Sequence, residues 1–124
     1  MIVLDENLHE QRVRSPLAVG YPGNVVSVRE LRRGTVIKDE AVPTLLREQN
    51  YPTFITTNVR DFWRKIAAHH RYCIVCLPLP NERQDEIPDL IFRLLRNRSF
   101  RTIKQRMGKV IWVSWSDLRY NEAG

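Results

Sequence analysis

The chain alternates short apolar runs with stretches of helical periodicity, and this order limits the folds that it can adopt. Two of the helical stretches, 58–70 and 84–96, repeat apolar residues at i, i+3 and i+4, as amphipathic helices do. We expect strands at 2–4, 25–28, 52–56, 72–77 and 109–113, and further helices at 6–14 and 39–50. Strands separated by helices imply right-handed crossovers, so the sequence predicts an α/β fold with a mainly parallel sheet of about four to five strands.

The length of 124 residues fits one domain, and we expect residues 1–124 to form it. The segment 15–23 contains two prolines and two glycines and is expected to break the chain, whereas the residues after 113 are expected to form a short polar tail. No apolar run approaches the roughly 18 residues that span a bilayer. The sequence begins with a strand-like run in place of a signal peptide, so we expect a cytoplasmic protein without membrane contact.

Cys73 and Cys76 are the only cysteines, and they form a C-x-x-C pattern inside an apolar run. A zinc site needs four ligands, and no second Cys or Cys/His pair occurs at a usable spacing. A redox C-x-x-C normally opens a helix, but this one falls on a predicted buried strand. We therefore expect two buried thiols in a reducing compartment.

Acidic residues follow or precede the predicted strands where an active site is expected. Ligands of parallel α/β sheets bind beyond the carboxyl ends of the strands. Asp5 follows the first predicted strand, Asp61 follows the third, and Asp39 and Glu40 begin the helix before the third. Carboxylates gathered in a protein of net charge +6 would suit Mg²⁺ or Mn²⁺ and phosphodiester hydrolysis. Helix capping is the alternative for each of these residues.

The same residues carry a family resemblance. Residues 2–8 (IVLDENL) resemble the "LLDENL" opening of short PIN-like domains related to VapC-type toxins. The strand-like segment 25–31, the acidic helix start 38–41 and the segment 57–62, which is similar to a T-x-D-x-D-F pattern, follow in the family's order. The resemblance covers residues 1–77. It implies a three-layer Rossmann-like PIN fold, a cluster of acidic residues that binds Mg²⁺ or Mn²⁺, and cleavage of RNA.

Carried over to this chain, the resemblance assigns catalytic positions to Asp5, Asp39 and Asp61, with Glu40 as the alternative to Asp39. The chain departs from the pattern at Val59, where the family has an acidic residue; Asn58 beside it is left to offer a carbonyl oxygen to the metal. The expected metal ligands are therefore Asp5, Asp61 and Asn58. The expected function is a metal-dependent endoribonuclease, the toxin of a toxin–antitoxin pair. A catalytically inactive PIN-like module that binds a partner protein or nucleic acid is the alternative.

Basic residues gather in two places and are expected to bind RNA. Arg32 and Arg33 lie in a basic loop, and a run without any acid extends from Arg93 to Lys109. The candidates in this run are Arg96, Arg98, Arg101, Lys104 and Arg106. Phe100 lies among them, and its ring is expected either to stack on a base or to pack in the core. The resemblance also implies a small helix-turn-helix antitoxin as partner and pairing into a homodimer.

Overall fold

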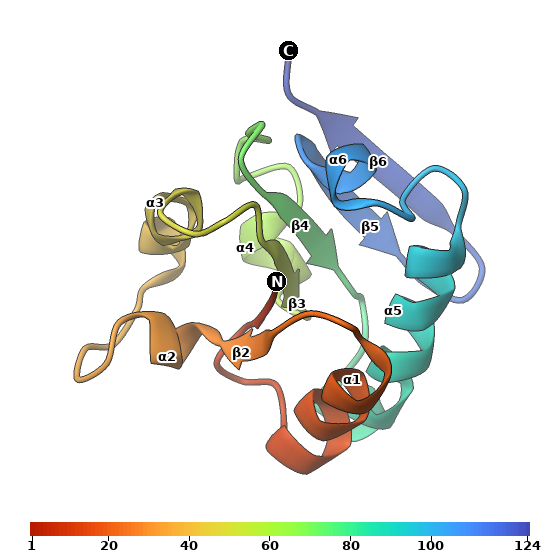
Figure 1. Cartoon of the computed structure of the whole chain (residues 1–124), viewed down its shortest axis with the longest axis horizontal. Coiled ribbons are helices and arrows are strands. Elements are labelled where there is room, and N and C mark those ends of the chain that lie inside the picture. Colours follow the sequence, from red (N-terminus) through yellow and green to blue (C-terminus); the bar gives the residue numbers. More distant parts are fainter.

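The computed structural model describes residues 1–124, and its centre is a six-stranded sheet in the order β2-β1-β3-β4-β5-β6 (Figure 1). Strands β1 to β5 pair in parallel, and β6 pairs antiparallel with β5. The strands are β1 Ile2–Leu4, β2 Val25–Ser27, β3 Thr53–Thr56, β4 Cys73–Cys76, β5 Lys109–Val113 and β6 Leu118–Glu122. The predicted α/β class with a mainly parallel sheet is confirmed and is compatible with a Rossmann-like fold, but the sheet has six strands where four to five were expected.

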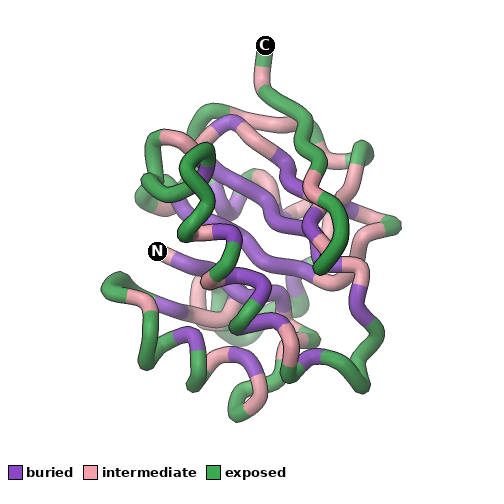
Figure 2. The backbone as a smooth tube through the Cα atoms, turned by 90° about the vertical axis from the view of Figure 1, so that its right-hand side faces the viewer, coloured by how far each residue is buried: buried purple, intermediate pink, exposed green.

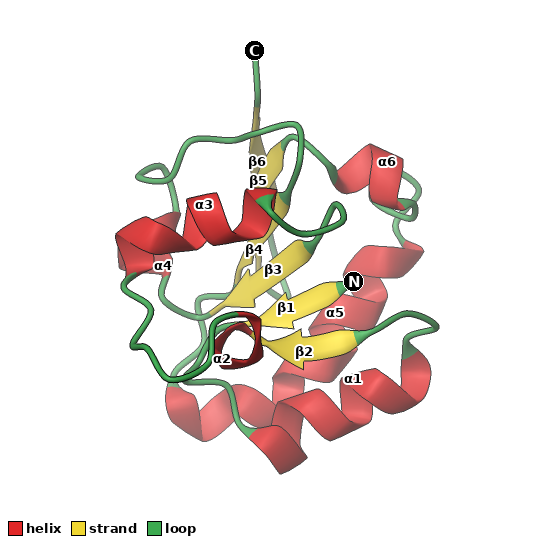
Figure 3. Cartoon of the chain, turned by 60° about the vertical axis from the view of Figure 1, so that its left-hand side comes forward, coloured by secondary structure: helices red, strands yellow, loops and turns green.

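Helices cover both faces of the sheet (Figure 3). One face carries α1 and α5, and the other carries α2, α3 and α4. The helices are α1 Ser15–Gly20, α2 Val28–Leu31, α3 Val42–Arg47, α4 Val59–Phe62, α5 Ile87–Arg96 and α6 Ile103–Arg106. Single turns precede three of them, at Glu10–Arg14, Asp39–Ala41 and Asn81–Glu86. No helix is long and apolar enough to cross a membrane.

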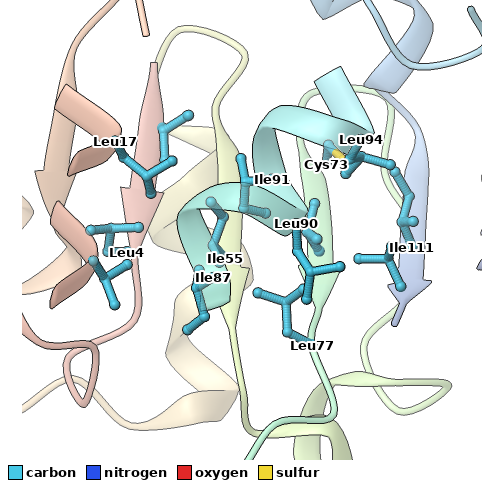
Figure 4. Close-up of a cluster of buried hydrophobic side chains, with 14 of the residues drawn as sticks. Leu4, Leu17, Ile55, Cys73, Leu77, Ile87, Leu90, Ile91, Leu94 and Ile111 are labelled. Carbon is cyan, nitrogen blue, oxygen red and sulfur yellow. The ribbon is translucent and has the colours of Figure 1, made fainter. Parts of the chain in front are cut away.

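Alternate residues of the central strands feed two separate cores, because successive side chains of a strand point to opposite faces. Leu4, Ile55 and Ile111 pack beneath the apolar side of α5, which presents Leu90 and Leu94 (Figure 4). The other core holds Val3, Phe54 and Val110 from the same strands, together with residues of α3 and α4. The central strands are therefore buried on both sides, as the tube coloured by burial shows (Figure 2).

The two cysteines follow the same alternation and lie in different cores. Cys73 packs on the α5 side of β4, and Cys76 packs on the α3 side. Both are free and buried, and burial raises the pKa of each thiol to about 12. Two side chains that point to opposite faces of the sheet cannot share a disulfide or a metal ion. The prediction of two buried thiols is confirmed.

The helix expected over 58–70 is wrong beyond its first turn. It ends at Phe62, after which Trp63 has extended backbone and Arg64 has a φ of 65°. Trp63 and Ile66 still pack against the second core, but they do so from a loop. The apolar periodicity therefore indicated correctly which side chains pack against the core. It did not indicate the conformation of the backbone.

Three other expectations differ from the structure. The segment 15–23 forms α1 over its first six residues, with Pro16 in the first turn, where a missing backbone donor costs nothing. The helix expected over 39–50 is shorter, because a single tight turn at Asp39–Ala41 precedes α3. The expected polar tail contains β6. The backbone N–H of Ser114 donates to the carbonyl of Asp117 at 2.9 Å, and this turn folds the polar segment back onto β5.

Candidate functional site at the carboxyl ends of the strands

A polar cleft of about 540 Å³ lies beyond the carboxyl ends of β1, β3 and β4. Because β1 and β3 are neighbours in the sheet, the segments that follow them are brought side by side. The segment after β1 contributes Asp5, the segment after β3 contributes Asn58, and the loop after β4 contributes Asn81. Asp39 reaches the same cleft from the turn that precedes α3.

Asp5 is held rigidly at the floor of the cleft. Its side chain is only 6% exposed, and its Oδ2 accepts a 2.6 Å hydrogen bond from the Thr56 hydroxyl. Its Oδ1 accepts the backbone N–H of Glu6 at 2.8 Å. Burial raises the pKa of Asp5, and these two hydrogen bonds partly offset the increase.

Asn58 joins two other carboxylates through its amide nitrogen. Its Nδ2 donates to Asp39 Oδ2 and to Asp61 Oδ2, at 2.9 Å each. Its Oδ1 accepts the backbone N–H of Asp61 at 3.3 Å, so Asn58 is also the N-cap of α4. The carbonyl oxygen that was expected to face a metal is therefore used by the helix, and the amide nitrogen lies between the carboxylates of Asp39 and Asp61.

The negative charge around Asp39 is only partly balanced. Its pKa is raised to about 6, chiefly by burial and then by the charges of Asp5, Asp61 and Glu40. The pKa of Asp61 is lowered instead, because Asn58 donates to it and Lys65 and Arg60 lie nearby. The pKa values of Asp5 and Asp39 are thus raised while that of Asp61 is lowered, although the three residues come together from separate segments.

Glu40, the alternative to Asp39, is exposed and does not line the cleft. Val59, at the position where an acidic residue was expected, packs against the core beneath α3 and α4. The acidic residues that line the cleft are therefore Asp5, Glu6 and Asp39, and Asp61 lies beside it, joined to Asp39 through the Asn58 amide.

The donor set suits a hard divalent cation in chemistry, since it consists of carboxylate and amide oxygens and carries excess negative charge. No three Asp, Glu, His or Cys side chains stand close enough together to hold an ion as they are arranged. Mg²⁺ is commonly bound through one or two carboxylates and several waters, and the pair Asp39 and Asp61 meets that smaller requirement.

Sequence reasoning missed the neutral polar residues of the cleft. The hydroxyl of Thr56 is completely buried; it donates to Asp5 and accepts the backbone N–H of Asn58 at 2.9 Å. The side-chain amide of Asn7 donates to the Thr57 hydroxyl at 3.2 Å, and Asn81 faces both across the cleft. The signal in the sequence was that Thr56 directly follows the apolar pair Phe54 and Ile55 at the carboxyl end of a strand.

The basic residues fall in two separate segments. Arg32 and Arg33 follow α2, and Arg32 Nη2 lies 3.9 Å from Oε1 of Glu48 at the end of α3. The run with Arg96, Arg98, Arg101 and Lys104 connects the end of α5 to the start of β5, so it lies at the amino ends (Figure 3). The two sets of candidates do not form one surface around the cleft.

Arg106 is only 2% exposed and is not available to a nucleic acid. Its Nε donates to the Thr53 hydroxyl at 3.1 Å, and its Nη1 donates to the carbonyls of Phe100 and Arg101 at 3.1 Å. The prediction of a phosphate contact is wrong for this residue, because the guanidinium ties α6 to the start of β3. Phe100 is also buried, so its ring packs in the core and does not stack on a base.

No protein family, curated protein or solved structure was found to match this chain.

Proposed function

We propose that the protein is a PIN-like endoribonuclease that uses Mg²⁺ or Mn²⁺ in the cleft at the carboxyl ends of the strands. The observation that carries this proposal is the convergence of Asp5, Asp39 and Asp61 from three separate segments, with the pKa of Asp39 raised to about 6. Carboxylates held together in this way attract a cation. The sequence resemblance over residues 1–77 supports the choice of RNA as substrate.

Asp39 and Asp61 would hold the ion, and this requires the side-chain amide of Asn58 to release the two carboxylates. Asp5 would add the third negative charge of the cluster. A bound divalent ion would supply a water of lowered pKa and neutralise charge that builds up on a phosphate. The residues of this chain would position the substrate. Asn7, Thr57 and Asn81 offer neutral hydrogen-bonding groups along the cleft, and Arg60 and Lys65 bring positive charge beside Asp61.

The role of toxin in a toxin–antitoxin pair belongs to the same proposal. It is supported by the sequence resemblance, which also supports a small helix-turn-helix antitoxin and a homodimer as the assembled form. Expression of the chain in a bacterial host, alone and with the adjacent gene of its operon, tests this part. Growth arrest that the neighbour relieves is expected; unimpeded growth at a verified expression level would contradict the toxin role.

The enzyme is tested by calorimetric titration with Mn²⁺ and by cleavage of a labelled RNA, in wild type, Asp39→Asn and Asp61→Asn. Asp89→Asn is the matched control, since Asp89 is an exposed carboxylate on α5 outside the cleft. We expect micromolar-to-millimolar Mn²⁺ binding and EDTA-sensitive cleavage in wild type and control, and the loss of both in the two cleft variants. Cleavage that persists in both variants would contradict the assignment.

A catalytically inactive PIN-like module is the second candidate, and two observations favour it. Val59 packs, partly buried, against the core where the resemblance leads one to expect a carboxylate, and the amide nitrogen of Asn58 already donates to both Asp39 and Asp61. RNA binding that EDTA does not change, without Mn²⁺ binding or cleavage, would favour this candidate over the enzyme.

A further inference from the structure

The amino ends of the strands carry a surface with a character opposite to that of the cleft. The segments that precede β3, β4 and β5 meet there, and so does the end of α5. We call this the amino-edge surface and define it by Tyr51, Arg96, Arg101, Ile103 and Lys104, all of which are exposed. It lies at the amino ends of the strands, where Figure 3 shows α6 and the end of α5, whereas the cleft lies at the carboxyl ends.

Two apolar hollows of about 470 Å³ each flank Ile103 on this surface. The first is lined by the aromatic rings of Tyr21 and Phe92 and is bordered by Arg96 and Arg101. The second is lined by Tyr51, His70, Ile103, Lys104 and Met107. Ile103 is 43% exposed and Tyr51 is 42% exposed, so both present apolar area to solvent beside positive charge.

The cations of this surface have no acidic partners. Arg96, Arg101 and Lys104 form no ion pair, whereas Arg12 and Arg83 on the opposite side of the fold each pair with a carboxylate at 2.7 Å or less. No acidic residue occurs between Asp89 and Asp117 in the sequence. The guanidinium of Arg71 lies over the ring of Tyr51, 5.0 Å from its centroid, and Tyr51 is nevertheless 42% exposed.

Unpaired cations, exposed aromatic rings and apolar hollows occur together in sites for single-stranded nucleic acid, where phosphates meet the cations and bases stack on the rings. An acidic protein segment would use the cations but would not require flat rings beside them. We propose that the amino-edge surface binds single-stranded RNA at a distance from the acidic cleft. The cations hold the backbone, and Tyr51 with the neighbouring hollows receives bases.

The choice of RNA rests on the proposed function, but the binding itself does not need an active cleft. A strand held at the amino ends would extend around the domain, and part of it would reach the cleft at the carboxyl ends. The surface would thus add affinity for long RNA substrates without taking part in the chemistry. Binding in EDTA and cleavage in Mn²⁺ are separate readouts, so failure of one proposal can be told from failure of the other.

The first experiment measures fluorescence anisotropy of a labelled, unstructured single-stranded RNA in EDTA. The test variant is Arg101→Gln combined with Lys104→Gln. The control is Arg83→Gln combined with Arg119→Gln, which removes the same charge from exposed positions after β4 and beside the carboxyl half of β5. We expect the test variant to bind about tenfold more weakly and to lower the salt slope of log K by about 1.4, as two lost phosphate contacts require. Equal weakening in both variants, or weakening in the control alone, would overturn the proposal.

The second experiment separates the contribution of base stacking to RNA binding from the contribution of charge. Tyr51→Ala is expected to weaken RNA binding by roughly fivefold or more, because one stacked base is lost, while the salt slope stays the same. Circular dichroism verifies that the variant is folded. Polyglutamate of matched charge should compete poorly with the RNA. If it competes as well as unlabelled RNA does and Tyr51→Ala has no effect, the surface reads charge alone, and an acidic protein segment becomes the better partner.

Discussion

The amide nitrogen of Asn58 lies 2.9 Å from Oδ2 of Asp39, and the same nitrogen lies 2.9 Å from Oδ2 of Asp61. The amide is a neutral donor with partial positive charge, so it lessens the repulsion between Asp39 and its neighbours without removing it. The pKa of Asp39 therefore remains raised, to about 6.

We predict that the pKa of Asp39 is visible in the pH dependence of stability. Its folded-state pKa of about 6 lies above the value of 3.8 for the free side chain, so the folded state binds more protons between these values. The free energy of unfolding contributed by this group falls as pH rises from about 4 to about 6, and stays low above that window. Urea titrations across this range, with Asp39→Asn as the variant that lacks the step, measure it. An identical pH profile in both proteins would contradict the prediction.

We predict that Thr56→Val destabilises the protein by about 2 kcal/mol, although the two side chains have nearly the same shape. The buried hydroxyl donates to Asp5 and accepts from the backbone of Asn58, and valine leaves both groups without that partner. The pKa of Asp5 should rise further, because a hydrogen bond that favours its charged form is lost. Chemical denaturation measures the loss of stability, and carbon NMR of the carboxyl group measures the pKa of Asp5. Thr44→Val, at an exposed position on α3, is the control and should change stability little.

We predict that Val59→Asp gives the cleft a stronger hold on Mn²⁺. The substitution adds a carboxylate in the first turn of α4, where negative charge is favoured, while the loss of a partly buried valine costs about 1 kcal/mol. Calorimetry should show tighter Mn²⁺ binding than in wild type, and Val59→Asn is the control of similar shape without the charge. If both variants bind Mn²⁺ as wild type does, the position does not face the ion.

We predict that Arg106→Met destabilises the protein by about 3 kcal/mol and leaves its affinity for RNA unchanged once the fold is verified. Methionine fills the space of the guanidinium stem but leaves the Thr53 hydroxyl and the Phe100 and Arg101 carbonyls without their donor. Arg101→Gln should behave in the opposite way, with a change in stability below about 0.5 kcal/mol and weaker RNA binding. A loss of RNA affinity in folded Arg106→Met would show that this reasoning is wrong.

The sheet was predictable because its central strands are short, uniformly apolar runs that helices separate. The position of the basic run was predictable as well: a segment between the end of α5 and the start of β5 must lie at the amino ends of parallel strands. The loop after Phe62 was not predictable, because Trp63 and Ile66 bury apolar surface equally well without a helix. The direction of the Asn58 amide depends on where Asp39, 19 residues earlier in the chain, is brought beside it, and local sequence does not contain that information.

The antiparallel strand β6 has a consequence for how the protein behaves at high concentration. Without it, β5 with the sequence KVIWV would be an open edge of the sheet, rich in β-branched and aromatic residues and ready to pair with another chain. The strand β6 occupies that edge. Its exposed residues include Arg119, Asn121 and Glu122. Charged side chains on an outer strand discourage further addition of strands. The polar strand β6 thus protects the domain against aggregation through the β5 edge of its sheet.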